Sequence, residues 1–427
     1  MTTVDPRRTI EAIWRIESAK LIARLARIVR DVGRAEELAQ EAFVVALEQW
    51  PSSGVPEKPG AWLMATAKHR ALDHLRRDRL HGKKQEELAR RLEAKQESPS
   101  SELDDALDDE IGDDLLRLIL TACHPELAEE ARVALTLRLV GGLTTEEIAR
   151  AFLLPVATIA QRIVRAKRTL AEKNVTFESP RGAELSERLS SALAVVYLVF
   201  NEGYAATTGD VWIRPALCDE ALRLGRIIAE LVPGEREAHG LTALMEFQAS
   251  RLRARVGSTG EPILLNDQNR ARWDHLLIQR GLRSLARADA LGGSPGPYEL
   301  QAAIAACHAT ARAAEETDWG RIVALYGELS ARLRSPVVEL NRAVAVSRQD
   351  GPAKGLEIVD ALVAEGSLDG YHLLPSVRGD LLQKLGRLDE ARADFEAAAS
   401  LATNLRERAL LIDRARSCDA SRPTSSG

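Results

Sequence analysis

The sequence contains few aromatic residues, few cysteines and no long apolar run. Phe, Trp and Tyr together make up 4% of its 427 residues, and β-sheet proteins usually need more aromatic and β-branched residues than that. Ala, Leu, Arg and Glu dominate instead, and these residues favour helices. The composition therefore predicts an all-α protein, and the length predicts two or three domains.

The four cysteines are scattered, without a CxxC pair or a histidine at metal-ligand spacing. This argues against a disulfide framework and a structural zinc, and it fits a reducing compartment. The N-terminus lacks the apolar run of a signal peptide, and the most apolar segment, residues 189–200, is shorter than the roughly 20 residues that span a bilayer. We therefore expect a cytoplasmic protein without membrane contact, metal or cofactor.

Charge is segregated along the chain, although the net charge is only −5. Residues 68–91 and 162–173 are basic, whereas residues 97–114 contain many acidic residues and no Lys or Arg. The acidic stretch, with the sequence SPSSELDDALDDE, is typical of a solvated, mobile linker. The pattern predicts two basic helical segments joined by an acidic tether, whose negative charge could discourage binding of free DNA.

A helix-turn-helix is predicted between residues 144 and 170. Thr144 begins the first helix, and the glutamates that follow it suit the positive end of the helix dipole. Pro155 suits the turn, and Ile159 and Ile163 bury one face of the second helix. The opposite face carries side chains that can read base edges: Thr158, Gln161, Arg162, Arg165 and Arg168. This arrangement favours DNA binding, although a surface helix of any Arg-rich protein has a similar pattern.

Taken together, three segments resemble a bacterial sigma factor of the extracytoplasmic-function class. GRAEELAQEAFVVALEQWP is similar to regions 2.1–2.2 of that family, PGAWLMATAKHRALDHLRR to regions 2.3–2.4, and LTTEEIARAFLLPVATIAQRIVRAKRTL to region 4.2. The resemblance spans residues 10–172 and includes no region 3, as this class implies. The chain departs from the family at Leu153, where the turn usually has Gly, at His69, where Asn is common, and at Ala160, where a basic residue is frequent.

The resemblance implies a protein that binds core RNA polymerase, places it at a promoter, helps to open the −10 element and performs no catalysis of its own. The surface for the coiled coil of the polymerase β′ subunit is implied at Glu37, Leu38, Gln40, Glu41 and Phe43. The helix near the −10 element is implied to carry Lys68, His69, Arg70, Asp73, Arg76 and Arg77. Thr158, Gln161, Arg162, Arg165 and Arg168 match the −35 recognition helix, and their neighbours would meet the flap of the β subunit.

The C-terminal region is predicted to be a series of helices with a tetratricopeptide-like repeat. One repeat is typical of that family in spacing, with Gly379, Leu382, Gly386, Leu388, Ala391, Phe395 and Ala398. A looser copy lies around Ala343, Gly355, Val359 and Leu362. The stretches YLVFNEGYAA, RWDHLLI, GPYELQAAIAACHA and SPVVELNRAVAV resemble a subgroup of these sigma factors with such an extension. Because helical repeats form concave binding surfaces, our hypothesis is that this region regulates the sigma domains, by contacting them or by holding a partner.

The predicted domains are 1–92 for sigma region 2, 93–112 for an acidic flexible linker, 113–173 for sigma region 4, 184–416 for the repeat domain and 417–427 for a tail. A helix-turn-helix transcriptional regulator with a sensory helical domain is the main alternative, and it would bind its operator tightly without polymerase. An enzyme domain in the C-terminal half is a second alternative, but the sequence shows no constellation of catalytic residues there.

Two smaller motifs of the C-terminal region have structural interpretations. In Asn201-Glu202-Gly203-Tyr204, Gly203 is predicted to end the preceding apolar helix as a left-handed cap, and a ligand or partner contact is the alternative. Trp273 lies between charged neighbours, and packing is a better explanation for it than chemistry.

Overall fold

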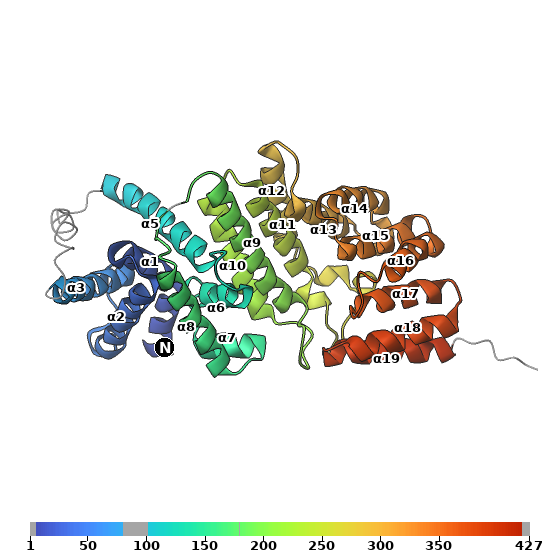
Figure 1. Cartoon of the computed structure of the whole chain (residues 1–427), viewed down its shortest axis with the longest axis horizontal. Coiled ribbons are helices and arrows are strands. Elements are labelled where there is room, and N and C mark those ends of the chain that lie inside the picture. The colour runs from blue at the N-terminus through green and yellow to red at the C-terminus, as the bar shows by residue number, and fades with distance from the viewer. Residues whose placement is uncertain (1–5, 80–100, 179, 421–427) are drawn as a thin grey trace, which may run out of the picture. The chain divides into compact units, whose positions relative to one another are not determined.

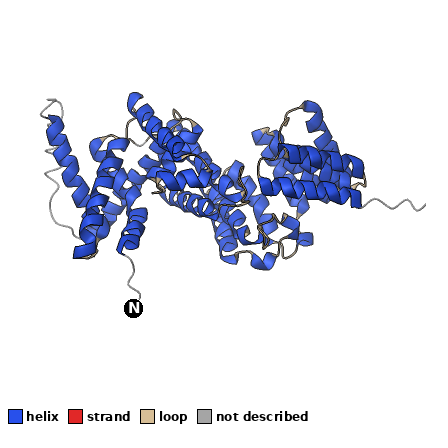
Figure 2. Ribbon diagram, turned by 90° about the horizontal axis from the view of Figure 1, so that it is seen from below, coloured by secondary structure: helices blue, strands red, loops and turns tan. Residues whose placement is uncertain are grey.

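The computed structural model is built from helices, and the residues it describes contain no strand (Figures 1 and 2). It describes the backbone of residues 6–79, 101–178 and 180–420, and the side chains of this part apart from 6–8, 72–79, 101–111 and 420. The prediction of an all-α fold is confirmed. None of the described helices is long and apolar enough to cross a membrane.

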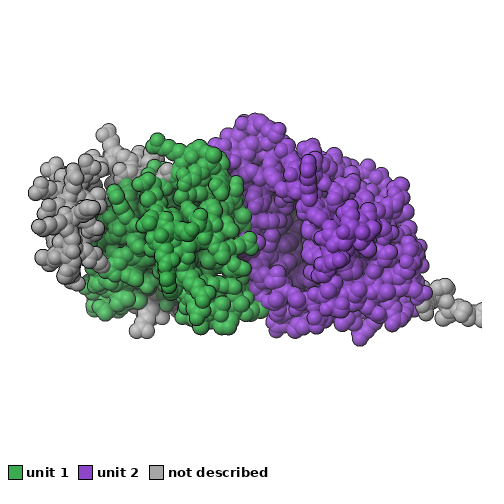
Figure 3. Space-filling view, in the orientation of Figure 1, with its two compact units in different colours: residues 1–196 green, residues 197–427 purple. Residues whose placement is uncertain are grey.

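The chain divides into two compact units, residues 1–196 and 197–427, which Figure 3 shows in different colours. The division falls within helix α9 (Ala183–Tyr204), whose first residue is close to the predicted start of the C-terminal domain at 184. The two units are described separately below.

The first unit begins with three helices, α1 (Pro6–Val29), α2 (Val32–Ser53) and α3 (Pro59–Arg79), which pack against one another. The side chain of Asp31 caps α2 by accepting a hydrogen bond from the Arg34 amide at 2.7 Å. Leu25, Leu38 and Leu63, one from each helix, are at most 1% exposed and form part of the core. The apolar stripe of each helix therefore explains this bundle.

Four further helices follow in the first unit: α5 (Ser101–Ala122), α6 (Glu129–Leu139), α7 (Thr145–Phe152) and α8 (Val156–Glu172). Residues 101–112 form the first turns of α5, so the prediction of a flexible linker is wrong for this part of 93–112. Residues 93–100 lie outside the described residues. The acidic residues concentrate at the N-terminal end of α5, where the helix dipole favours negative charge. This interaction stabilises a helix in a segment whose composition alone predicts a mobile linker.

The second unit stacks its helices in chain order, as in a helical-repeat protein, and each helix from α10 onward packs on the next (Figure 1). The helices are α10 (Pro215–Leu231), α11 (Arg236–Ser250), α12 (His275–Ala290), α13 (Pro297–Thr310), α14 (Trp319–Leu333), α15 (Pro336–Gln349), α16 (Pro352–Glu365), α17 (Leu373–Lys384), α18 (Leu388–Leu401) and α19 (Leu405–Ala420). Short 3₁₀ turns lie at η1 (Leu252–Ala254), η2 (Leu265–Asp267), η3 (Arg270–Arg272) and η4 (Ala314–Glu316).

Both repeat motifs read from the sequence correspond to close-packed helix pairs. A Cβ atom at Gly379 of α17 would lie 3.0 Å from the ring of Phe395 of α18, which is fully buried. In the looser copy, a Cβ atom at Gly355 of α16 would lie 2.7 Å from the carbonyl oxygen of Ala343 of α15. Small residues at these positions therefore allow the helices of each pair to approach closely.

Gly203 has a different role from the predicted left-handed cap. It lies within α9 and not in the left-handed region, and a Cβ atom there would be 2.7 Å from the amide nitrogen of Cys218 in α10. The helix continues through Gly203 because the following helix packs directly onto its backbone. Close packing, not backbone conformation, requires glycine here.

The substitution Gly203→Ala is expected to destabilise the protein by about 1–3 kcal/mol, because the added methyl group forces the α10 backbone away from α9. Gly234→Ala is the matched control, since a Cβ atom at Gly234 meets nothing within 4 Å. Thermal unfolding followed by circular dichroism measures both. Equal midpoints for the two variants would contradict this account.

All four cysteines are free and buried. Burial raises the pKa of the Cys123 thiol to about 11, and its hydroxyl neighbour Thr136, 3.2 Å away, only partly opposes that shift. Burial also raises the pKa of Cys218 to about 12. These thiols are therefore protonated near neutral pH and serve as small apolar core residues.

Candidate nucleic-acid interface

The predicted start of the helix-turn-helix is confirmed by a capping box at the N-terminus of α7. The Glu147 amide donates to the Thr144 hydroxyl at 3.1 Å, and the Thr144 amide donates to the Glu147 carboxylate at 2.8 Å. These bonds satisfy backbone donors that an uncapped helix leaves free. Ile148 and Ala149 bury the inner face of α7.

The turn between α7 and α8 has the left-handed geometry that glycine favours, although Leu153 occupies it. Leu153 has φ of 52° and ψ of 41°, and the next residue, Leu154, donates its amide to the carbonyl of Ala149 at 2.9 Å. The departure from glycine at this position therefore leaves the turn type unchanged, at the cost of some backbone strain in Leu153.

Replacing Leu153 with glycine is expected to stabilise the protein by up to about 1 kcal/mol. A left-handed residue with a Cβ atom costs about 1–2 kcal/mol, and the greater freedom of glycine in the unfolded chain offsets part of the gain. Leu153 is 51% exposed, so little burial is lost. A thermal midpoint below that of the parent protein would show that the Leu153 side chain contributes more than the strain costs.

Helix α8 has one buried face and one exposed polar face. Ile159, Ile163, Ala166 and Leu170 are buried against the rest of the unit. On the opposite side Gln161, Arg165 and Arg168 are exposed, whereas Thr158 and Arg162 are half-buried. Arg168 is paired with Glu172 at 2.6 Å, and that hydrogen bond raises the pKa of Arg168. All five predicted base-reading residues are thus on one helix, and Gln161 and Arg165 are exposed.

The predicted −10 helix is α3, and the structure places three of its six predicted residues in detail. His69 is exposed, while Lys68 and Arg70 are half-buried. Arg70 pairs with Glu41 of α2 at 2.8 Å. Asp73, Arg76 and Arg77 also lie on α3, but their side chains are outside the described part of the chain.

The predicted polymerase-binding residues of α2 do not form one exposed surface. Leu38 is 1% exposed and belongs to the core, so its prediction as a docking residue is wrong for this conformation. Phe43 is half-buried and packs on the ring of Trp14, with centroids 4.6 Å apart. Glu37 is exposed and pairs with Arg34 at 2.7 Å.

The remaining two predicted residues of α2 make polar contacts. Gln40 donates to Glu36 at 2.6 Å, and Glu41 pairs with Arg70 of α3. Glu37 is exposed, and Gln40 and Glu41 are half-buried. All three side chains can therefore be reached by a partner.

Glu36 is a central residue that the sequence analysis missed. Its side chain is 3% exposed, and it pairs with Arg138 of α6 at 2.6 Å and with Lys167 of α8. The signal in the sequence is a glutamate spaced four residues after Val32 and three before Ala39, on the buried stripe of α2. A buried carboxylate is stable only with such partners.

Two more ion pairs join α1–α3 to α5–α8 within the first unit. Arg15 of α1 pairs with Glu147 of α7, and Arg27 of α1 pairs with Asp114 of α5 at 3.4 Å. Asp114 is 1% exposed. Helices α1 and α2 therefore contact α5–α8 through polar side chains.

Family models match three parts of the chain. Sigma-70 region 2 matches residues 16–80, sigma-70 region 4 matches residues 117–170, and a family of unknown function (DUF6596) matches residues 188–289. The helix-turn-helix formed by α7 and α8 lies inside the region 4 match apart from the last two residues of α8, and α2 and α3 lie entirely inside the region 2 match.

Relatives of the chain include an uncharacterized protein and ECF RNA polymerase sigma factors. The uncharacterized protein R00370 of Rhizobium meliloti (strain 1021) is 43% identical over 388 residues, which cover 91% of this chain and 90% of that protein. The probable ECF RNA polymerase sigma factor SigI of Mycobacterium tuberculosis (strain CDC 1551 / Oshkosh) is 29% identical over 179 residues, 41% of this chain and 58% of SigI. The ECF RNA polymerase sigma factor SigC of the same strain is 29% identical over 147 residues, 34% of this chain and 74% of SigC.

The chain contains a sigma-70 region 2 and a sigma-70 region 4, and these matches support an ECF-like sigma factor. The chain belongs to the same family as R00370, with which it shares nearly its whole length.

Proposed function

We propose that this sigma factor directs transcription initiation by binding core RNA polymerase and reading two promoter elements. The observation that supports this most directly is the exposed polar face of α8, opposite a fully buried apolar face, in a capped helix-turn-helix. Arginine can read guanine and glutamine can read adenine in the major groove. Helix α8 would read the −35 element, and α3 would contact the −10 element.

The proposed contact residues follow from this assignment. DNA contacts are assigned to Lys68, His69, Arg70, Asp73, Arg76, Arg77, Thr158, Gln161, Arg162, Arg165 and Arg168. Contacts with the β′ coiled coil are assigned to Glu37, Gln40, Glu41 and Phe43, without Leu38, and neighbours of α8 would meet the β flap. Arg70 and Glu41, which pair in this structure, would have to exchange partners when both polymerase and DNA bind.

The C-terminal unit is proposed to regulate the sigma domains, as expected for a tetratricopeptide-like extension. Its helices stack in chain order, and this arrangement provides a binding surface in helical-repeat proteins. An intramolecular contact with the sigma domains is one way in which it could act. A truncation that tests this should end after Tyr204, because Ser191 of α9 donates to the Cys123 carbonyl at 2.6 Å and accepts from Arg132, so a cut at 184 would disturb region 4.

Run-off transcription with bacterial core RNA polymerase tests the proposed function. The full chain is expected to bind core polymerase and to support initiation from a selected promoter, while binding the same DNA weakly on its own. Tight operator binding by the protein alone, without polymerase binding, would support the alternative of a helix-turn-helix regulator instead.

A further inference from the structure

Three arginines gather against aromatic rings in the C-terminal unit, at the end of α11 and in the turns that follow it. The guanidinium carbon of Arg255 lies 3.6 Å from the ring centroid of Tyr204 and 5.6 Å from that of Trp212. Arg251 approaches the same Tyr204 ring at 5.7 Å. Two positive charges therefore share one aromatic ring, which attracts cations through its electron-rich face.

Arg270 completes the cluster from η3. Its guanidinium lies 4.6 Å from the ring centroid of Trp273, and it donates to the main-chain carbonyls of His308 and Ala311 at 2.5 and 2.8 Å. Burial and then the charge of Arg251 lower the pKa of Arg270. Trp273 is buried as predicted, and Arg270 rather than the adjacent Arg272 covers its ring.

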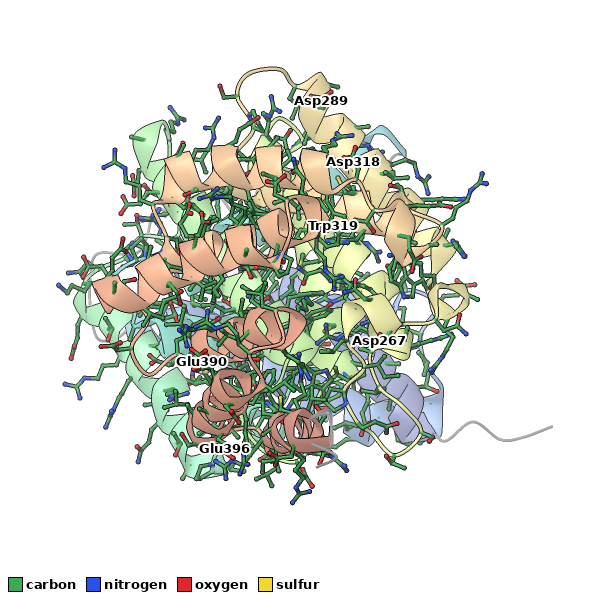
Figure 4. The ribbon with its side chains drawn as sticks, turned by 90° about the vertical axis from the view of Figure 1, so that its right-hand side faces the viewer. Asp267, Asp289, Asp318, Trp319, Glu390 and Glu396 are labelled. Carbon is green, nitrogen blue, oxygen red and sulfur yellow. The ribbon has the colours of Figure 1, made fainter. Side chains whose placement is uncertain are left out.

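No carboxylate forms an ion pair with Arg251, Arg255 or Arg270 within the described residues. Asp267 and Asp318, labelled in Figure 4, make none with them, and Asp318 instead caps α14 by accepting from the Arg321 amide. Glu315 and Glu316 act on Arg270 only at longer range.

Other arginines of this unit have a carboxylate partner, which Arg251, Arg255 and Arg270 lack. Partly buried arginines elsewhere are each paired with a carboxylate: Arg214 with Glu202, Arg226 with Glu246, and Arg236 with Glu299. By contrast, the Nε atom of Arg255 is buried and has no hydrogen-bond partner. Burying a charge without a counter-ion is costly. The three arginines therefore lack the negative charge that the other partly buried arginines of this unit have.

The aromatic groups around the cluster are neutral. Burial and the charges of Arg251 and Arg270 lower the pKa of His308 to about 4, and its ring lies edge-on to Trp319 with centroids 5.2 Å apart. Burial raises the pKa of Tyr326 to about 12. None of these side chains offsets the positive charge of the arginines near neutral pH.

We propose that Arg251, Arg255 and Arg270 bind a small anionic ligand through its carboxylate or phosphate group. An oxyanion supplies the missing negative charge and accepts charge-assisted hydrogen bonds from planar guanidinium groups, which is the ligand chemistry that arginine prefers. The three arginines and Tyr204 are only half-buried, so a ligand can reach them. This site brings together motifs of YLVFNEGYAA, RWDHLLI and GPYELQAAIAACHA, and it does not depend on the proposed sigma function.

Isothermal titration calorimetry of the full-length protein with inorganic pyrophosphate and with citrate tests the site, at an ionic strength held constant with sodium chloride. At least one anion is expected to bind, and Arg251→Met is expected to weaken that binding at least tenfold. Arg253→Met is the matched control, because Arg253 is exposed, lies two residues away and carries the same charge. Preference for pyrophosphate identifies a phosphate ligand, and preference for citrate a carboxylate ligand.

The proposal is overturned if neither anion binds, or if Arg253→Met weakens binding as much as Arg251→Met does. The thermal midpoint of the ligand-free variant is a second readout. Arg251 has no ion pair to lose, so Arg251→Met is expected to keep or raise the midpoint. A lowered midpoint with unchanged anion binding would assign Arg251 a structural role and overturn the proposal.

Discussion

Replacing Glu36 with glutamine is expected to destabilise the first unit by about 3 kcal/mol, because the neutral side chain leaves Arg138 and Lys167 without their buried counter-ion. The substitution keeps the size of the side chain, so the effect comes from charge and not from a cavity. Since Glu36 joins α2 of region 2 to α6 and α8 of region 4, its loss is also expected to loosen the contact between the two regions.

Hydrogen exchange of the backbone amides in α2, α6 and α8 measures this effect locally, which a global unfolding curve of a two-unit chain does not. A loss of 3 kcal/mol corresponds to exchange about 100-fold faster. Glu37→Gln is the matched control, because Glu37 is the next residue, is exposed and pairs with half-buried Arg34 of the same helix. We expect less than about 0.5 kcal/mol from it. Similar exchange in the two variants would show that the Glu36 pairs contribute little.

The double substitution Arg162→Ala/Arg165→Ala is expected to reduce promoter-specific transcription about 100-fold or more. A good bidentate contact between arginine and guanine is worth about 1–3 kcal/mol of discrimination, and no ion pair holds either side chain in the described part of the chain. Both residues lie outside the buried face of α8 that holds Ile159 and Ile163, so the fold should persist.

Run-off transcription over a range of salt concentrations checks this prediction and separates base reading from phosphate contact. Loss of base contacts relaxes the choice of promoter sequence, whereas loss of phosphate contacts weakens binding to all sequences and lowers its dependence on salt. Arg181→Ala, which removes an exposed arginine beyond α8, is expected to leave transcription within about twofold. If both variants lose the same activity, α8 is not the recognition helix.

Local features of the fold were predictable because their causes lie within a few residues. Thr144 and Glu147 are three residues apart, and the capping box forms as this spacing predicts. The repeat motif around Gly379 and Phe395 likewise forms a close helix pair. In both cases the interaction joins neighbouring turns or neighbouring helices, so the pattern in the sequence already contains both partners.

Predictions failed where the partner of a residue comes from a distant segment. The sequence predicts a cap at Gly203, but α10 packs on it and makes it an interior residue of α9. On α2, the family resemblance implies a binding role for Leu38, which lies in the core, and implies none for Glu36, two residues before it. The buried stripe of α2 distinguishes Glu36 from Glu37, but only the approach of α6 and α8 supplies Arg138 and Lys167 as its partners.

The sequence by itself determined the helical class, the helix-turn-helix with its caps, and the repeat of small residues, since helix propensity, capping and periodicity act over one or two turns of chain. Only the tertiary structure decided which charges are buried together. Charged residues that interact, such as Glu36 with Arg138 or Arg251 with Arg270, are far apart in the sequence. Their interaction energies depend on burial and on the distance between the charges. Those two quantities exist only once the helices have packed.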